Sequence, residues 1–278
     1  MKRFLRSAWF GAVSTLLCAA VILPILWMAL LSFKSQAEIL KWPPDFLFVP
    51  TLENYAAIFL SQSTQHLPFL NVLANSLIIT LVSLFISLTL SALAAYSIAR
   101  LRPKGRVGIN YLILGMRMIP PIAIVVPMYI IWQKIGLYDT LLGLIIPYVA
   151  LDIPLSTWML QGFFEGIPGN LEDAAKVDGC TRFQAFRRII LPLAAPGSAA
   201  TSIFSFSTAW NNLTLPLPLT LTRAATLPVL ASQVRTDEGV LWGQLGAYAT
   251  LMMIPMVIFT AFAARYLIQG MASGAVKE

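Results

Sequence analysis

Two charged residues, Arg117 and Asp152, lie inside long apolar runs of the sequence. A charge in the middle of a membrane costs about 2.5–3.5 kcal/mol on insertion scales, so it normally faces the protein interior or water and finds a partner. The two charges have opposite signs, and their expected depths agree within about one helical turn. We expect both to face the interior and to pair with each other. The alternative is that Arg117 bonds the carbonyls freed by Pro120 and Pro121. Neither residue has the surroundings of a catalytic group.

Hydroxyl groups are frequent in a later apolar run, which contains Ser202 and Ser205 and ends near Trp210 and Asn211. One face of such a helix could offer hydrogen bonds to a polar ligand, and an aromatic ring beside an amide suits such a ligand. The alternatives are structural. Serine can bond backbone carbonyls that are freed within its own helix, and tryptophan is common at the membrane interface.

Small residues recur at every fourth position of another apolar run. They are Ser83, Ser87, Ser91 and Ala95. This spacing places them on one face of a helix, and small side chains allow two helices to approach closely. We interpret this face as a packing surface and not as a ligand site.

The segment EDAAKVDGCTRFQAFRRIILP, residues 172–192, is charged and polar in a chain that is 58% hydrophobic. Asn170 suits the N-cap of a first short helix, and Gly179 suits its C-terminal end. Thr181 and Gln184 have the spacing of a capping box for a second short helix. The segment is either a solvated loop that joins two spans or a surface that another protein binds.

The composition is that of an integral membrane protein. Only 11% of the 278 residues are charged, whereas soluble domains carry about 25%. A helix needs about 20 apolar residues to cross the hydrocarbon core, and six runs are long enough. These runs are residues 9–31, 72–98, 109–132, 141–163, 193–212 and 245–268. We therefore predict an all-α protein with six transmembrane helices. The first is expected to be retained, because its run is too long for a signal peptide.

The basic residues lie mostly on one side of these six spans. Thirteen of the 19 Lys and Arg residues fall on the side that holds both termini and the segment 172–192. Cytoplasmic loops carry such an excess, so we place the termini and this segment in the cytoplasm. The net charge of +7 does not indicate nucleic acid as a partner, because the charges are distributed between apolar runs.

The sequence offers no set of residues for catalysis or metal binding. It contains no G-x-x-x-x-G-K-[ST] motif for a phosphate-binding loop, so ATP chemistry would belong to a partner. Its single histidine, His66, falls in a loop on the outer side, and Cys18 and Cys180 lie in settings too different for a disulfide. We therefore predict a protein that is not an enzyme and that binds no cofactor or metal directly.

The segment 172–192 resembles the EAA motif of the permease subunits of ATP-binding-cassette (ABC) importers. Its flanks resemble the carbohydrate branch of that family, the maltose-type inner-membrane permease. The matching stretches are NSLIIT (75–80), SALAAYSIARL (91–101), RMIPP (117–121), PMYIIW (127–132), FSTAWNN (206–212) and GAVKE (274–278). Asp173 stands where the family more often has glutamate. Asn212 stands where the family often has an acidic residue, and we assign it no role.

The resemblance implies a type I ABC importer permease fold. Residues 1–71 would form an N-terminal transmembrane helix and a periplasmic loop, residues 72–268 a permease core with a coupling loop at about 165–192, and residues 269–278 a cytoplasmic tail. In such importers the first helix of the loop docks on a cytoplasmic ATPase. The coupling residues implied are Glu172, Asp173, Ala174, Ala175, Asp178 and Gly179. The predicted translocation path comprises Arg117, Asp152, Ser202, Ser205, Trp210 and Asn211.

The function implied is import of a sugar or small oligosaccharide across the bacterial inner membrane by alternating access. The partners implied are a second permease subunit, two cytoplasmic ABC ATPase subunits that use the ATP, a periplasmic or lipid-anchored solute-binding protein, and membrane lipid. A polyol, glycerol phosphate or another small solute is the alternative cargo. An ion-coupled secondary transporter is a more distant alternative, since the sequence shows no coupling-ion site and no internal repeat.

Overall fold

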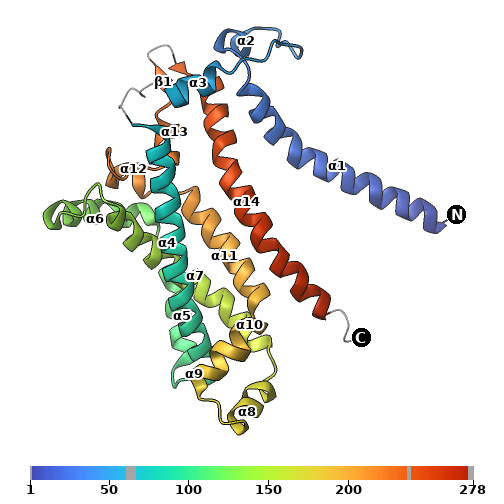
Figure 1. Ribbon diagram of the computed structural model, residues 1–278, viewed down its shortest axis with the longest axis vertical. Helices are drawn as coiled ribbons and strands as arrows, with labels where there is room; N and C mark the ends of the chain where they lie inside the picture. Colours follow the sequence, from blue (N-terminus) through green and yellow to red (C-terminus); the bar gives the residue numbers. More distant parts are fainter. Residues whose placement is uncertain (1, 61–66, 237–238, 275–278) are drawn as a thin grey trace. The chain divides into compact units, whose positions relative to one another are not determined.

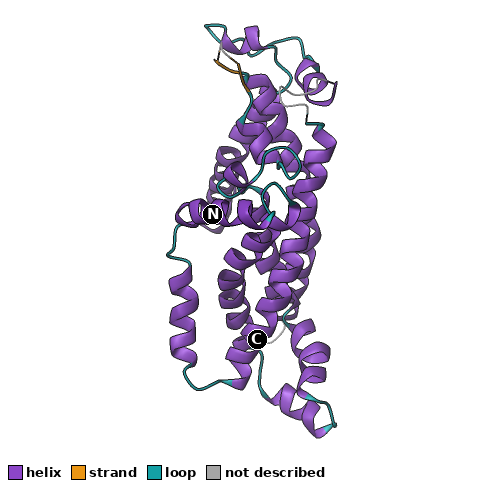
Figure 2. Cartoon of the chain, turned by 90° about the vertical axis from the view of Figure 1, so that its left-hand side faces the viewer, coloured by secondary structure: helices purple, strands orange, loops and turns teal. Residues whose placement is uncertain are grey.

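The computed structural model describes residues 2–60, 67–236 and 239–274 of the chain (Figure 1). Almost every element in these ranges is a helix (Figure 2), which confirms the predicted all-α class. The exception is a short antiparallel hairpin of strands β1 (Arg235–Thr236) and β2 (Gly239–Val240). The predicted loop histidine, His66, and the last four residues of the predicted tail lie outside the described residues.

The chain divides into two compact units. One comprises residues 1–69 and 230–254. Its complete helices are α1 (Lys2–Leu31), α2 (Gln36–Leu40) and α3 (Glu53–Leu60). Helix α14 (Trp242–Gly274) begins in this unit and continues in the other. The second unit comprises residues 70–229 and 255–278, and it contains all the residues of the candidate site.

The second unit is built from helices that follow one another through short connections. In chain order these are α4 (Phe69–Tyr96), the π-helix η1 (Ser97–Leu101), α5 (Arg106–Met116), α6 (Pro121–Ile135), α7 (Leu141–Gly166), α8 (Asn170–Val177), α9 (Arg182–Ala185), the π-helix η2 (Phe186–Ile190), α10 (Leu191–Leu193), α11 (Ala195–Trp210), α12 (Pro216–Leu219) and the start of α13 (Leu227–Ser232), which ends in the first unit. Helix α7 packs against both α5 and α11, so it is the central helix of this unit.

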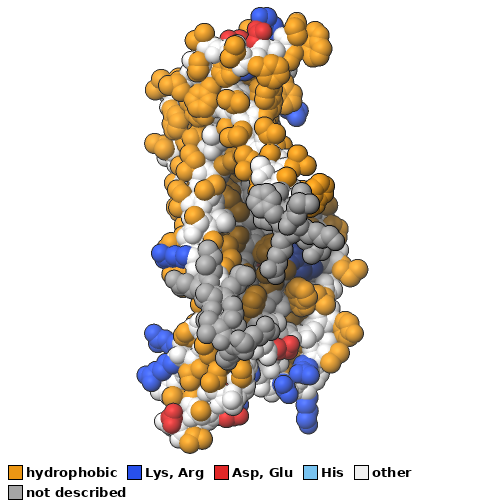
Figure 3. All heavy atoms as spheres, turned by 90° about the vertical axis from the view of Figure 1, so that its right-hand side faces the viewer, with side chains coloured by type: hydrophobic (Ala, Val, Ile, Leu, Met, Phe, Trp, Pro, Cys, Tyr) orange, Lys and Arg blue, Asp and Glu red, His pale blue; other side chains and the backbone are white. Residues whose placement is uncertain are grey.

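Several helical stretches are long and apolar enough to cross a membrane. In the described ranges they are Trp9–Leu31, Phe69–Leu101, Leu141–Gly166 and Trp242–Leu267. Two further helix pairs pass the same test only together, and each is bent at its break: α5 with α6 by 80°, and Arg182–Leu193 with α11 by 74°. The described chain thus has four such helices, or six spans if each bent pair forms one. Hydrophobic side chains are spread along the face shown in Figure 3, and many large ones are exposed, which suits a lipid environment.

The predicted third span is therefore not a straight helix. The second bend lies at the start of the predicted fifth span, most of which is the unbroken helix α11. Proline explains both breaks. Proline has no amide hydrogen to donate to the carbonyl four residues earlier. Pro120 and Pro121 follow each other here, and α5 ends at Met116 while α6 begins at Pro121. Pro196 likewise cannot donate to residue 192, and the second break falls at Ala194.

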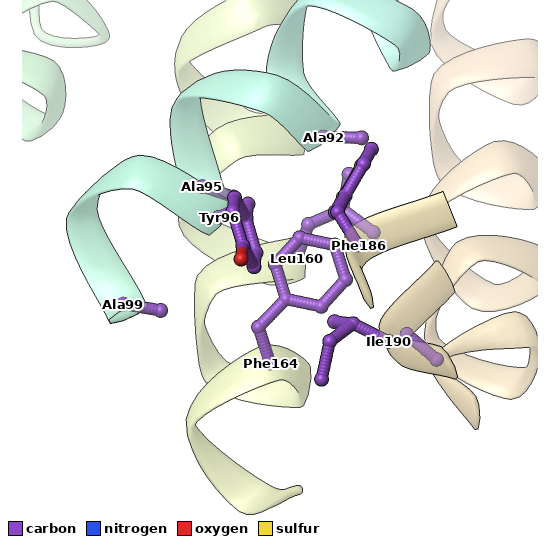
Figure 4. Packing of buried hydrophobic residues seen from close by; sticks show 9 residues of the cluster. Ala92, Ala95, Tyr96, Ala99, Leu160, Phe164, Phe186 and Ile190 are labelled. Carbon is purple, nitrogen blue, oxygen red and sulfur yellow. The ribbon is translucent and has the colours of Figure 1, made fainter. Parts of the chain in front are cut away.

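A hydrophobic cluster joins α4, α7 and η2 (Figure 4). The rings of Tyr96, Phe164 and Phe186 lie with their centroids 4.8 to 6.5 Å apart. Burying an aromatic side chain of this size stabilises the fold by about 1.5–3 kcal/mol. The cluster therefore fixes η2, and with it the end of the preceding loop, against α4 and α7.

The small residues of α4 form a buried packing face as predicted, but two of them, Ser83 and Ser87, also line the cavity described below, which the prediction did not include. Ser83, Ser87, Ser91 and Ala95 are all buried. The hydroxyl of Ser91 donates to the carbonyl of Ile153 on α7 at 3.2 Å. Helix α4 thus approaches α7 closely enough for a side chain of one helix to bond the backbone of the other.

Candidate functional site

A cavity of about 330 Å³ in the second unit is lined by α4, α5, α6, α7, α11 and the residues that follow α11. This volume lies at the lower end of the range of about 300–1,000 Å³ for small-molecule sites. Much of the wall is hydrophobic, with residues such as Leu84, Tyr148 and Leu151. Its polar lining includes Ser83, Ser87, Arg117, Asp152, Ser205 and Asn212. An apolar wall with a few polar groups is the usual composition of a small-molecule site.

Serine hydroxyls from two helices hold the carboxylate of Asp152 on α7. Its Oδ2 atom accepts hydrogen bonds from Ser87 of α4 at 2.6 Å and from Ser156 of α7 at 2.8 Å. The Ser156 hydroxyl also lies 2.9 Å from that of Ser205 on α11. Because a hydroxyl has only one proton, Ser156 donates to Asp152 and accepts from Ser205. Within the described residues, the Oδ1 atom of Asp152 accepts no hydrogen bond.

Arg117 lines the same cavity from the C-terminal end of α5. Its guanidinium makes no ion pair or hydrogen bond with the residues that the structure describes. The predicted pair with Asp152 is therefore not formed in the described part of the chain, and neither is the alternative bond to carbonyls near Pro120. The break after Met116 places Arg117 at a helix end, and serine hydroxyls satisfy one oxygen of Asp152 instead.

Three residues predicted for the path lie outside the cavity lining. Ser202 donates its hydroxyl proton to a carbonyl of its own helix at 2.8 Å. Trp210 is only 2% exposed and stacks against Phe206, so it belongs to the core. Asn211 is exposed and donates to a carbonyl one turn earlier at 3.0 Å. The cavity thus brings together the other three members of the prediction, Arg117, Asp152 and Ser205.

Helical geometry explains this division. Ser205 and Ala209 are four residues apart on α11, so they share one face, and both line the cavity together with Asn212, which lies just beyond the end of the helix. Asn212, to which the sequence pattern assigned no role, is therefore part of the site. Ser87 and Ser156 were missed as well. The spacing of four between Asp152 and Ser156 could have indicated that contact, but Ser87 lies 65 residues from its partner.

Helix α8 has two different faces. Glu172 and Ala175 are buried against the rest of the chain, with 6% and 4% of their surface exposed. The other predicted coupling residues, together with a valine, are exposed. These are Asp173, Ala174, Val177, Asp178 and Gly179. Two of the six predicted coupling residues thus face this chain, and four face outward.

The ends of the loop helices agree with the sequence pattern at all positions but one. The prediction of Asn170 as N-cap is wrong: Gly169 holds that position, and no side chain caps the helix. Gly169 already has helical angles (φ −66°, ψ −30°), whereas a capping side chain needs an extended N-cap. Gly179 has a φ of +83°, and both bonds of the Thr181–Gln184 capping box form, as predicted.

Glu172 connects α8 to the end of α4. Tyr96 donates its hydroxyl proton to Oε1 of Glu172 at 2.8 Å. The Nε atom of Arg100 lies 3.9 Å from Oε2, and the Nζ atom of Lys176 lies 3.5 Å from Oε1. Arg100 also donates to the carbonyl of Ile167, just before α8. Sequence reasoning missed Tyr96, because nothing local relates it to a residue 76 positions later.

Asp139, in the turn between α6 and α7, holds the segment that follows α12. Its carboxylate accepts hydrogen bonds from the backbone N–H groups of Leu221, Thr222, Arg223 and Ala224 at 2.9 to 3.1 Å. Partial burial alone would raise the pKa of Asp139, but these four bonds outweigh burial and hold the pKa below its ordinary value. The carboxylate therefore stabilises this turn in its charged form.

Replacing Asp139 by asparagine is expected to lower the free energy of unfolding in detergent by about 1–2 kcal/mol at neutral pH, after allowance for solvent screening. Asparagine tolerates the left-handed backbone of this residue (φ +54°). It keeps one acceptor oxygen, but its NH2 group cannot accept the hydrogen bonds that the second carboxylate oxygen accepts.

The effect should depend on pH with a defined sign. Because the folded pKa of Asp139 is lowered, its contribution is complete above the unfolded pKa of about 3.9 and is lost as the pH falls through the lower folded value. The midpoints of thermal denaturation of the parent and of Asp139→Asn should differ at pH 7, and this difference should become smaller in acid. Thr222→Val keeps the backbone donor but removes the 3.4 Å hydrogen bond from the Thr222 hydroxyl to Oδ2 of Asp139, so its loss of stability should be smaller than that of Asp139→Asn. A difference that is constant with pH would contradict this account.

Comparison with known proteins extends these observations. Residues 87–273 match the family described as binding-protein-dependent transport system inner membrane component. The chain is 38% identical to the trehalose transport system permease protein SugB of Mycobacterium tuberculosis, over 98% of each protein. It is 34% identical to the diacetylchitobiose uptake system permease protein DasC of Streptomyces coelicolor, over 100% of each.

The fold is also found in a solved structure, that of a bacterial ABC transporter involved in the import of the acidic polysaccharide alginate. The TM-score is 0.71 over 92% of this chain and 96% of that chain, at 21% sequence identity. The chain thus has a type I ABC importer permease fold, and it is a multi-pass inner-membrane transport component and not an enzyme. The family model covers well over half of the sequence, and the relatives align along nearly all of it. The chain therefore belongs to the family of binding-protein-dependent transport system inner membrane components.

Proposed function

We propose that this chain is one permease subunit of an ATP-driven importer that moves a sugar or small oligosaccharide across the inner membrane by alternating access. The observation that carries the proposal is similarity along nearly the full length to permeases named for trehalose and diacetylchitobiose. The cavity supports it, because a small apolar-walled site with a few polar groups suits a hydroxylated molecule. Arg117, Asp152 and Ser205 are the path residues that this cavity supports.

The outward face of α8 is the proposed docking surface for a cytoplasmic ATPase. Both termini and α8 lie on the cytoplasmic side in this proposal, because the basic residues favour that side. Exposed Ala174 lets the ATPase approach the helix backbone, and Asp173 and Asp178 add charge to the same surface. ATP is then bound and hydrolysed by the partner, and this chain receives the movement.

Glu172 and Ala175 act on the inner side of the same helix. Because Glu172 bonds Tyr96 at the end of α4, a movement of α8 pulls directly on α4. Helix α4 in turn lines the cavity through Ser83 and Ser87. A continuous series of contacts within one unit thus leads from the docking surface to the cavity.

The complete importer in this proposal contains four kinds of component. They are this chain, a second permease subunit, two ATPase subunits and a periplasmic or lipid-anchored solute-binding protein. One chain of similar fold comes from the alginate transporter in complex with its alginate pentasaccharide-bound periplasmic protein. Residues 1–71 would then provide the first helix and a periplasmic loop, and residues 72–268 the permease core.

Reconstitution of the purified chain with its partner subunits in proteoliposomes tests the proposal. We expect uptake of radiolabelled trehalose or maltose that requires ATP and the binding protein. A cysteine in place of Ala174 should cross-link to the ATPase, whereas a cysteine in place of Ala56, exposed on α3, should not. Uptake by this chain alone, driven by an ion gradient, would contradict the proposal.

A further inference from the structure

The carboxylate of Asp152 has one oxygen held and one available. Ser87 and Ser156 hold Oδ2 from two different helices, so the group cannot turn without breaking two charge-assisted hydrogen bonds. Both serines are fully buried. Oδ1 has no partner in residues 2–60, 67–236 and 239–274, and Asp152 lines the cavity. Since a carboxylate oxygen can accept two hydrogen bonds, Oδ1 remains an oriented acceptor for a ligand.

The serines around this carboxylate have no proton left for that ligand. Ser87 and Ser156 donate to Oδ2, and Ser205 donates to Ser156, because each hydroxyl has a single proton. This part of the cavity wall therefore accepts hydrogen bonds and does not give them. A ligand that binds here must bring the donor, as an O–H or N–H group.

Arg117 provides the complementary group in the same cavity. A guanidinium has five N–H donors and no acceptor, and none of its donors is used by the described residues. Arg117 and Asp152 are the only charged residues in the described lining. A cationic ligand would be attracted by Asp152 but repelled by Arg117. An anionic ligand would be attracted by Arg117 but repelled by Asp152. A neutral group that both donates and accepts satisfies the two residues together, and the hydroxyl is such a group.

We propose that Asp152 and Arg117 bind hydroxyl groups of the cargo directly, Asp152 as acceptor and Arg117 as donor. This subunit then selects a neutral, polyhydroxylated ligand and does not leave selection to the external binding protein alone. The inference rests on the proposed function and deepens it, since it names the residues and the kind of cargo. The apolar remainder of the wall, with Leu84 and Leu151, suits the C–H surfaces of such a molecule.

Uptake by proteoliposomes that contain the complete importer tests the inference, with trehalose, maltose and their monodeoxy analogues as probes. Asp152→Asn keeps an oxygen for the two serines but turns the available acceptor into a donor. We expect uptake of the parent sugar below saturation to fall at least tenfold. At least one monodeoxy analogue lacks the hydroxyl that would bind to residue 152. The parent importer and the Asp152→Asn importer should transport that analogue at the same rate.

Arg117→Gln is the second variant. Arg117 is exposed and has no partner in the described chain, so this change should leave folding intact. Uptake of the parent sugar should fall by a similar factor. A different monodeoxy analogue should be transported at the same rate by the parent and by Arg117→Gln. The matched control is Thr89→Val on the exposed face of α4, where the hydroxyl bonds only its own helix. It should transport as the parent does.

The possible results separate the two proposals. If the parent importer carries no neutral sugar with ATP, the proposed function fails and the inference fails with it. If the parent carries the sugar but the two variants transport every probe at the parent rate, only the inference fails. Equal loss for all analogues in both variants would show that these residues support the helices and do not touch the cargo, which also overturns the inference.

Discussion

Replacing Ala174 by leucine is expected to reduce ATP-driven uptake at least tenfold while the permease still inserts and folds. Ala174 is exposed on the outward face of α8, and leucine is nearly as good a helix former as alanine, so the isolated chain should tolerate the change. In the docked complex the larger side chain must fit between α8 and the ATPase. Overfilling a closely packed contact costs about 1–3 kcal/mol, and about 1.4 kcal/mol is a tenfold change in affinity.

The size of the side chain should decide the result. Ala174→Ser, which adds one atom, should retain most of the uptake, and Ala56→Leu on α3 should transport as the parent does. Co-purification of the ATPase with each variant, together with ATP-dependent uptake in proteoliposomes, measures the effect. If Ala174→Leu binds the ATPase and transports normally, α8 is not the docking surface.

Helix α8 also shows which features follow from local sequence. Capping residues and turn glycines act on neighbours within a few positions of the sequence. Local sequence could therefore predict the two short helices, the left-handed conformation of Gly179 and the capping box of Thr181 and Gln184. The inward face of α8 could not, because the partner of Glu172 is Tyr96, 76 residues earlier. A buried glutamate beside an exposed alanine is the reverse of what side-chain polarity suggests.

The membrane-spanning helices show the same limit. Run length predicted six spans, because bilayer thickness fixes how many apolar residues a helix needs. A proline indicates that a backbone hydrogen bond is missing, but it does not determine the angle of the bend. The 80° angle between the two helices of the third span depends on packing. For Asp152, charge alone suggested the guanidinium of Arg117, whereas the structure supplies buried serine hydroxyls from neighbouring helices. Those contacts are set by tertiary packing and leave little trace in the local pattern.

Removing the carboxylate of Glu172 is expected to separate ATP hydrolysis from transport. In Glu172→Ala, Tyr96 and Arg100 lose their shared partner. The hydrogen bond from Tyr96 to this charged acceptor contributes about 1.5–3 kcal/mol. The 3.9 Å ion pair with Arg100 adds less, because Arg100 keeps its hydrogen bond to the carbonyl of Ile167. Helix α8 could then follow the ATPase without moving α4. We expect uptake at least tenfold lower, with the ATPase still bound through the unchanged outward face.

Tyr96→Phe distinguishes this effect from a general loss of stability, since it removes one oxygen atom and keeps the ring in its aromatic cluster. It should reduce uptake less than Glu172→Ala does, and the double variant should be no worse than Glu172→Ala alone, because both changes break one contact. Tyr111→Phe, at a side chain that is 72% exposed on α5, is the matched control and should leave uptake unchanged. Sugar transported per ATP hydrolysed decides the question. If the losses multiply in the double variant, Tyr96 and Glu172 act separately, and α8 moves α4 by another route.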